Sequence, residues 1–462
     1  MYSEILKRNN LNSLKIIDII DNHLKNQKKI PDSQNLIKIF YMELVIYASN
    51  FNIIKYSPFK HNSPVQFPYL NSDYINNQKK IKFKRLKNKN RLIDSLKIGI
   101  NKNIFISRNI SLNKKKLVML NIMNKVQFLS EINLTLLEMD NQIIDLNILL
   151  KKIMNFFKLK NANFSSNFVN YVKVNLSDGN NLTNFRPKNS TLIVGTNMNI
   201  SNRLLSAKFL QEKTNKVISI NHSCYPFYLY NEPIRNVEYS LCTDYISYGN
   251  YNFSKKIKKT FFSIPKFHFT SFKNIKGNFK IKTIKKLNMR ENFKYLYVPN
   301  MFNKNIRYGP YRDMDDEIYY KFQKELLNTF RNANIKNHPK GQINHFRENE
   351  KHTKLNFDKI LNLYDVYIFD YFATAFSEAI ATDKPIIYFD LGLRNLEKSL
   401  LDIIKKRVYY YKINLDESFE QQLKKFLLNF DDHQINKQNF FTQKYSLNNK
   451  NKDIYELLNN IS

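Results

Sequence analysis

Cysteine, glycine, proline and tryptophan are all scarce in this chain, whose 462 residues include 2 Cys, 8 Gly, 12 Pro and no Trp. Two cysteines cannot build the disulfide framework of a small secreted domain, and without a CxxC pair they form no tetrahedral metal site. So few Gly and Pro exclude collagen-like and Gly-rich linker architectures. We therefore expect a protein of the reducing cytoplasm.

Long uncharged hydrophobic runs are absent as well. The N-terminal segment has acidic side chains in its first turns and no continuous apolar stretch, so the sequence predicts no secretory signal. No stretch of about 18–20 residues is free of charge, as a membrane-spanning helix requires. We expect a soluble protein that at most lies peripherally on the inner face of the plasma membrane.

Aromatic and basic residues, in contrast, are abundant. With 43% hydrophobic residues, 36 Phe and 29 Tyr, the chain can bury large cores, and its length predicts two or three domains. The formal net charge of +35 attracts polyanions such as nucleic acid, lipid headgroups or nucleotides. Compositional drift toward Asn, Ile and Lys would also produce such a charge, so the charge alone identifies no function.

From residue 191 short apolar runs alternate with helical segments, which is typical of a parallel sheet covered by helices. The runs 191–196, 217–222 and 244–249 predict strands, and 202–213 predicts a helix between the first two. We expect the early strands of this domain upstream.

The first 180 residues contain no catalytic motif, and their clearest element is a helix predicted at about 134–158. Residues 254–291 are Lys-rich with weak periodicity, which indicates a connection between domains.

A second and clearer alternation of strands and helices begins near residue 294. Its elements are predicted as strands at 294–300, 334–339, 365–370, 385–390 and 408–412, and helices at 316–330, 374–382, 395–406 and 417–430. Together the two series predict an α/β protein with two Rossmann-like domains and a cleft between them. The expected domains are 1–270, with a Rossmann-like half at about 191–252, then 285–430, and a helical tail at 431–462 that packs back.

In such sheets ligands bind beyond the carboxyl ends of the strands, so polar residues placed there are candidates for a site. Asp370 and Asp390 each end a predicted strand. A helix predicted to begin near Thr374 would point free N–H groups at a phosphate, with hydroxyls from Thr374 and Ser377. Glu378 would accept hydrogen bonds from a ribose, or else simply be a favourable acid in the first turn of the helix.

The run 338–390, with HPKG and then DVYIFDYFATAFSEAIATDKPIIYFD, resembles the C-terminal domain of GT-B-fold transferases that build bacterial surface polysaccharides. It is similar to the CDP-glycerol glycerophosphotransferase group and more closely to related surface-carbohydrate and O-antigen transferases. Where that group has serines after Asp-Tyr, this chain has Phe-Ala, which leaves Thr374 and Ser377 as the phosphate hydroxyls. INHSCYPF resembles the His-Gly element of these families, with Ser223 in place of Gly, and RYGPYRDMD resembles their Arg/Tyr-rich loop. The resemblance covers about 217–412.

The resemblance implies a metal-independent transferase, without a cofactor, that moves a sugar or glycosyl phosphate from a nucleotide-activated donor to a growing surface polysaccharide. The implied partners are that donor, a lipid-linked glycan acceptor and an anionic membrane surface, with no specific nucleic acid. The N-terminal domain would take the acceptor and the C-terminal domain the nucleotide. The candidate donor and phosphate contacts are Arg307, Arg312, His338, Lys340, Asp370, Thr374, Ser377, Glu378, Asp390 and Arg394.

A transferase must stabilise its leaving nucleotide and, if it inverts, deprotonate the acceptor. His222 is the candidate general base because it ends a predicted strand of the acceptor-side domain, and Glu238 and Asp244 are orienting or alternative bases. Each candidate also has a structural interpretation: a strand-end histidine for His338, a helix cap for Asp390, and solvated surface for Lys340, the two arginines, Glu238 and Asp244.

Metal chemistry finds little support in the sequence. The histidines lack HExxH-type spacing, and no DxD motif follows a strand. Two other classes of function stay open. A nucleic-acid-binding protein would use the basic surface and stacking Tyr and Phe, although no helix-turn-helix, RRM, KH or zinc-finger signature is present. A non-catalytic scaffold would keep the two sheets and bind no nucleotide.

Overall fold

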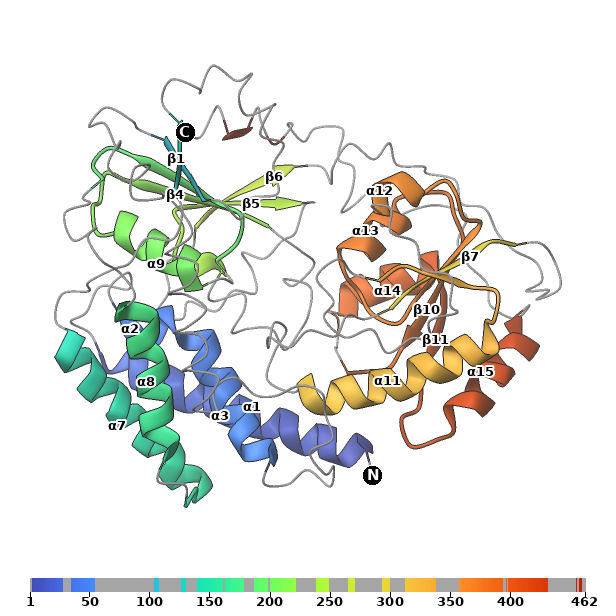
Figure 1. Ribbon diagram of the computed structural model, residues 1–462, viewed down its shortest axis with the longest axis horizontal. Helices are drawn as coiled ribbons and strands as arrows, with labels where there is room; N and C mark the ends of the chain where they lie inside the picture. The colour runs from blue at the N-terminus through green and yellow to red at the C-terminus, as the bar shows by residue number, and fades with distance from the viewer. Residues whose placement is uncertain are drawn as a thin grey trace, which may run out of the picture.

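The computed structural model describes residues 2–27, 35–54, 104–107, 126–129, 139–160, 163–177, 187–197, 200–221, 238–248, 265–270, 293–299, 312–337, 357–393, 396, 398–430, 454 and 457–458. Within these ranges the strands form two separate sheets, one in each half of the chain (Figure 1).

The first sheet contains six described strands in the order β2-β1-β3-β4-β5-β6, and every neighbouring pair is parallel. Their bounds are β1 Ile104–Ser107, β2 Val126–Leu129, β3 Thr191–Val194, β4 Lys216–Ile220, β5 Asp244–Tyr248 and β6 Lys266–Thr270. Helix α9, Ile200–Phe209, connects β3 to β4 and packs against both.

The second sheet contains five described strands in the order β11-β10-β9-β7-β8, again all parallel. Its strands are β7 Tyr295–Val298, β8 Asn334–Ile335, β9 Val366–Phe369, β10 Ile386–Asp390 and β11 Tyr409–Lys412. Its helices are α11 Arg312–Thr329, α12 Phe357–Ile360, α13 Thr374–Ile380, α14 Lys398–Arg407 and α15 Phe419–Leu428.

Both sheets follow the same winding rule. In each, the second strand of the domain lies on one side of the first strand and the third lies on the other, which is the 2-1-3-4-5 order of doubly wound folds. The chain reverses its direction of winding between β1 and β3 in the first sheet and between β7 and β9 in the second. The predicted fold class, α/β with two Rossmann-like domains, is confirmed by this strand pairing.

Each sheet is apolar on both faces because its strands are covered on both sides. Alternate residues of β3 point to opposite faces, so Leu192 and Val194 join one buried cluster while Ile193 joins another. In the second sheet one face packs on α13 and α14 and the other on α11 and α15. These continuous apolar runs are the feature that the sequence displays most clearly.

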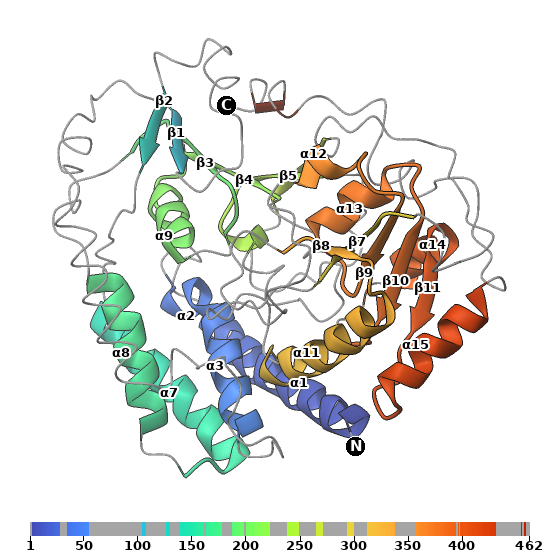
Figure 2. The same ribbon diagram turned by 45° about the vertical axis from the view of Figure 1, so that its right-hand side comes forward.

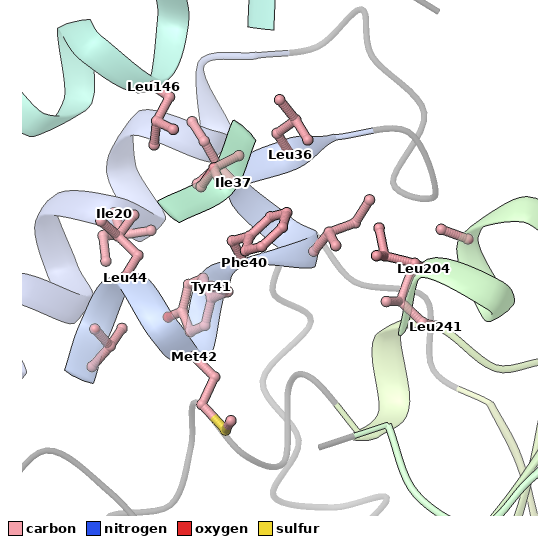
Figure 3. Close-up of a cluster of buried hydrophobic side chains, with 14 of the residues drawn as sticks. Ile20, Leu36, Ile37, Phe40, Tyr41, Met42, Leu44, Leu146, Leu204 and Leu241 are labelled. Atoms are coloured by element: carbon pink, nitrogen blue, oxygen red, sulfur yellow. The ribbon is translucent and has the colours of Figure 1, made fainter. Parts of the chain in front are cut away.

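A layer of helices precedes and interrupts the first domain (Figure 2). It consists of α1 Tyr2–Lys25, α2 Leu36–Ile39, α3 Tyr41–Ile54, α7 Met139–Phe157 and α8 Asn163–Ser177. Figure 3 shows how side chains of this layer, among them Phe40 and Tyr41, continue to Leu204 of α9 and Leu241. The layer therefore shares one core with the first sheet.

A buried ion pair crosses the same boundary. A guanidinium nitrogen of Arg203 in α9 donates to the carboxylate of Glu43 in α3, and the side chains are 0% and 4% exposed. Among the described residues, Nε and Nη1 of Arg203 and Oε2 of Glu43 have no hydrogen-bond partner. Within the part of the chain that the structure describes, the two buried charges are therefore compensated by this single contact.

Three strands lie where the sequence predicted none. β1 and β2 fall within the first 180 residues, and they are the upstream strands that the βαβ pattern required but did not locate. β6 falls inside 254–291, so reading that whole segment as a connection between domains was wrong. In β6, Phe267 packs on the core of the first domain and also on the core of the second. The strand therefore lies at the contact between the two domains.

The described part of the C-terminal tail lies on the first domain. Leu457 and Leu458 are buried in the cluster formed by Ile104, Ile193 and their neighbours on one face of the first sheet. The chain thus returns to the first domain after completing the second. The exact domain boundaries expected from the sequence stay a prediction.

Candidate functional site

The point where each sheet reverses its winding is marked by buried polar groups. In the first domain, Oγ of Ser107, at the end of β1, donates to Asn202 of α9 at 2.6 Å. Asn202 in turn donates to the carbonyl of Thr196, in the loop after β3, at 2.7 Å. Two strand ends on opposite sides of the reversal are therefore joined through one side chain.

Glu238 extends this network from a helical turn before β5. Its carboxylate accepts hydrogen bonds from the hydroxyl of Thr196 and the backbone N–H of Asn197, and lies 3.5 Å from the hydroxyl of Ser219. Its exposed fraction is 3%. The structure therefore places Glu238 beneath the loop after β3 and not in the solvated loop considered above. The hydrogen bonds that Glu238 accepts from Thr196 and Asn197 hold that loop in place. The role of Glu238 as a base stays a prediction.

Asp370 occupies the corresponding place in the second domain. It follows β9, is 1% exposed, and accepts from the hydroxyl of Tyr297 in β7 at 2.7 Å and from the amide of Gln323 in α11 at 2.8 Å. Burial, together with the neighbouring carboxylate, holds the pKa of Tyr297 well above its ordinary value, so the phenol stays a donor. Asp370 thus joins β7 to β9 across the reversal.

Helix α13 begins at Thr374, as predicted, and has seven residues. The Thr374 side chain is half-buried at the carboxyl edge of the sheet. Ser377 and Glu378 are buried, at 1% and 6% exposure, and Glu378 therefore does not present its carboxylate to solvent. Of the three side chains, that of Thr374 is therefore the most exposed.

Asp390 ends β10 and organises the next strand end. One carboxylate oxygen accepts the N–H of Gly392 at 2.7 Å, and the other accepts from Tyr410 and, at 3.2 Å, from Lys412. The residue does not cap a helix, since its backbone partner is the turn at Gly392, where φ is +70°. The side chain of Lys412, 54% exposed, brings a cation to this edge, and no sequence pattern indicated it.

Asp244 lies at the opposite edge of the first sheet because it begins β5 instead of following it. Its carboxylate accepts from His268 of β6 at 2.8 Å and from Thr243 at 2.8 Å. Burial alone would raise the pKa of Asp244, but these hydrogen bonds outweigh it and the pKa lies below its ordinary value. The structure therefore does not bring Asp244 together with the strand ends where His222 is predicted to act.

Several candidates lie outside the described residues: His222, Arg307, His338, Lys340 and Arg394. Arg312 is described as the first residue of α11. Their predicted roles stay predictions.

Lys336 is a buried cation that the sequence analysis missed. It directly follows β8, two residues before the first residue of the HPKG motif, is 7% exposed, and donates to the carbonyl of Asn337 at 3.2 Å. Burial lowers its pKa. The sequence feature that points to Lys336 is its place directly after an apolar strand in the pattern NIKNHP, where only His338 was singled out.

Among the described residues no three His, Cys, Asp or Glu side chains come together as metal ligands. None of the described helices has the length and apolar character that crossing a bilayer demands.

No family model and no curated protein matches the sequence. Solved structures similar to the chain include the glycosyltransferase SnogD from Streptomyces nogalater, at 7% identity and a TM-score of 0.33, with 72% of this chain and 95% of that chain covered. The spinosyn forosaminyltransferase SpnP has 7% identity and a TM-score of 0.33, over 71% of this chain and 90% of its own. The glycotransferase of kitacinnamycin has 8% identity and a TM-score of 0.33, over 72% and 91%. At these values the fold assignment rests on the strand pairing described above.

Proposed function

We propose that this protein is a metal-independent GT-B-type glycosyltransferase that moves a sugar, or a glycosyl phosphate, from a nucleotide-activated donor to a growing, lipid-linked surface polysaccharide. The observation that carries the proposal is the pair of all-parallel sheets with the same strand order. A chain with two such sheets has two strand-end crevices, and doubly wound sheets bind their ligands at these reversals. Two substrates, one for each domain, suit a transfer reaction.

The donor nucleotide is assigned to the second domain. Support comes from the sequence resemblance over 338–390 and from the groups that the fold collects at this edge. Thr374 supplies a hydroxyl, and Lys336 and Lys412 supply positive charge beside the ends of β8 and β11. Asp370 would position β7 and β9 beneath the ligand without touching it.

The acceptor is assigned to the first domain, where His222 follows β4 in the sequence and acts as the general base. In this proposal the buried network of Glu238 holds the loop after β3 in place. Removal of a proton by His222 and stabilisation of the departing nucleotide by cations are the two steps that the chain itself must supply.

The experiment is calorimetric titration of CMP, CDP, UDP, GDP, dTDP and ADP into the full-length protein, at moderate salt to suppress nonspecific attraction by the basic surface. We expect one nucleotide to bind selectively. Thr374→Ala should weaken it by about 3- to 10-fold, the usual effect of losing one hydrogen bond of about 0.5–1.5 kcal/mol.

The matched control lies at the other end of the same helix. Thr382 donates to the carbonyl of Ala379 at 2.7 Å, so Thr382→Ala also removes one threonine hydroxyl at a helix terminus. It should leave nucleotide affinity unchanged. His222→Ala should abolish turnover and leave nucleotide affinity nearly intact. Absence of selective binding, with salt-sensitive RNA binding instead, would refute the proposal.

A further inference from the structure

Exposed large hydrophobic side chains are concentrated on two helices of the N-terminal layer. Of the eight such residues among those described, five lie on α1 and α7: Leu11, Leu14, Ile144, Ile148 and Phe156, which are 39–57% exposed. Single exposed hydrophobic residues are ordinary, but a group of them on adjacent elements marks an interaction surface.

Helical spacing places these residues on outward faces. Ile144 and Ile148 are one turn apart on α7, and Leu11 and Leu14 are three residues apart on α1, while Ile16 of α1 and Leu146 of α7 are buried. Each helix therefore has a second apolar stripe, in addition to the one that joins the core.

Contacts between α1 and α7 bring the two stripes to the same side of the layer. Near the end of α1, His23 lies 2.9 Å from Asp145 near the start of α7, and Nζ of Lys15 lies 6.0 Å from the ring centroid of Phe156 near the end of α7. The helices thus run antiparallel and in contact. In both views they lie at the lower edge of the molecule (Figures 1 and 2).

The charge around this surface is mainly positive. The exposed lysines on the two helices and just after α7 are Lys15, Lys25, Lys151, Lys152, Lys158 and Lys160, whereas the exposed acids among the described residues of these helices are Glu4 and Asp18. Asp21 and Asp145 are engaged by Tyr41 and His23. Lysine stems pack on apolar surface while their ammonium groups reach the polar surroundings. The ammonium of Lys15 itself lies over the ring of Phe156.

We propose that this surface, made of Leu11, Leu14, Ile144, Ile148 and Phe156 with their six neighbouring lysines and called here the α1/α7 face, docks on a bilayer that contains anionic lipid. Apolar side chains enter the headgroup boundary and lysines meet the phosphates, as in interfacial helices. The inference rests on the proposed function for its lipid-linked acceptor. Binding to vesicles requires no transfer reaction. The vesicle experiment can therefore refute membrane docking without refuting the proposed transferase function, and the nucleotide titration can do the reverse.

The experiment is flotation of the full-length protein with phosphatidylcholine vesicles and with vesicles that contain 30% phosphatidylglycerol, about a third of the lipid, across a range of salt. We expect binding to the anionic vesicles only, decreasing as salt rises. Lys151→Gln with Lys158→Gln should weaken binding about 25-fold, since each lysine near such a surface contributes about fivefold, or roughly 1 kcal/mol. Ile144→Gln with Ile148→Gln should weaken it by about tenfold or more.

Matched controls are available elsewhere on the chain. Leu428→Gln changes the most exposed large hydrophobic residue among those described, 85% accessible on α15, and Lys188→Gln with Lys213→Gln removes two exposed lysines outside the face. The Leu428 variant should bind as the wild type does. The Lys188/Lys213 pair should lose clearly less than the Lys151/Lys158 pair. All variants should keep wild-type melting temperatures and nucleotide affinity.

Three outcomes overturn the inference. An equal loss of vesicle binding in the Lys151/Lys158 variant and the Lys188/Lys213 variant would show that binding depends on total charge alone. Unchanged binding in the Ile144/Ile148 variant would exclude the apolar contact. Sedimentation that shows a dimer in the wild type and a monomer in that variant would identify the occupant of the face as a second copy of the chain.

Discussion

The buried pair of Glu43 and Arg203 gives the sharpest test of how the helical layer is held on the first domain. The perturbation is Glu43→Met, alone and combined with Arg203→Met. Both side chains are almost fully buried, and the guanidinium has one described partner for its three nitrogens. Removing Glu43 alone leaves a buried charge without compensation, which typically costs about 3–5 kcal/mol.

The double variant should recover most of that loss. Replacing a buried pair by apolar residues of similar volume is commonly neutral or stabilising, because the desolvation penalty of both ions disappears. The absent hydrogen bonds at Nε and Nη1 of Arg203 and Oε2 of Glu43 strengthen this expectation, since those atoms gain nothing from burial. We expect the double-mutant cycle to give a coupling free energy of about 3 kcal/mol or more.

The assay is urea unfolding followed by far-UV circular dichroism for wild type, both single variants and the double variant. A single-variant cost below about 1 kcal/mol would mean that the charge is solvated after all and would refute the reasoning. A double variant as unstable as the singles would show that packing, and not charge compensation, gives these residues their importance. Lys424→Met, which breaks an exposed pair with Glu420 on α15, is the control and should change the free energy of unfolding far less than Glu43→Met.

Three further predictions concern the strand ends. Asp370→Ala leaves two buried donors without their acceptor and should lower the free energy of unfolding by roughly 1–3 kcal/mol for each, measured by urea denaturation. Gly392→Ala should lower the free energy of unfolding by about 1–2 kcal/mol, measured by thermal melting, because φ at this position is +70°. The added methyl group would lie 2.6 Å from Nζ of Lys412, which is the end of a flexible side chain and can move aside. The pKa of Asp244 is lowered in the folded protein from its ordinary value of 3.8. Its ionised carboxylate therefore stabilises the fold at pH values above 3.8, and this stabilisation is lost as the pH falls from there through the lowered pKa. In Asp244→Asn the melting temperature should fall less steeply between about pH 5 and pH 2 than in the wild type. A fall as steep as that of the wild type would show that the Asp244–His268 contact does not contribute to stability in acid.

The second domain was predicted from the sequence almost element by element, and the reason is physical. Its strands are buried on both faces, so each is a short continuous apolar run that stands out between helical segments. The strand 385–390 was observed as Ile386–Asp390, and the helix 417–430 as Phe419–Leu428. Many ends differed by one or two residues, where helices and strands fray. The differences reached four residues for the strand 334–339, observed as Asn334–Ile335, and for the helix 316–330, observed as Arg312–Thr329, and the short helix Phe357–Ile360 was not predicted.

The first domain shows why such reading fails. β1 and β2 have four residues each and lie far from the βαβ unit that they complete, so no local alternation announces them. β6 begins with Lys266 and has His268 between Phe267 and Phe269, and its first four residues are exposed or half-buried. It therefore resembles the surrounding Lys-rich segment. The helical layer packs against α9 through contacts between residues more than a hundred positions apart, as in Glu43 with Arg203.

The sequence located the strand ends of the second sheet at Asp370 and Asp390, but it could not indicate what each carboxylate contacts. Polar residues after strands did mark the carboxyl edge of the second sheet, as the strand ends at Asp370 and Asp390 show. Burial and hydrogen-bond partners, however, depend on residues distant in sequence. Asp370 meets a phenol 73 positions away, and nothing around position 370 indicates that its carboxylate is already occupied.

Both domains place a buried polar bridge at the reversal of winding, which supports our proposal that the substrates bind there. In the first, the amide of Asn202 bridges the two strand ends that flank the reversal of winding, and Glu238 holds the loop after β3. In the second, the carboxylate of Asp370 makes the bridge. Parallel strands that diverge there have no ladder hydrogen bonds beyond their ends, so the loops need other partners to stay fixed. Carboxylates bound to internal donors are poor proton acceptors for a substrate but rigid supports for the loops above them. We therefore expect Asp370→Asn and Glu238→Gln to weaken nucleotide or acceptor binding through displaced loops while His222 still titrates in the pH–rate profile. Loss of that titration in Glu238→Gln would instead identify Glu238 as the base itself.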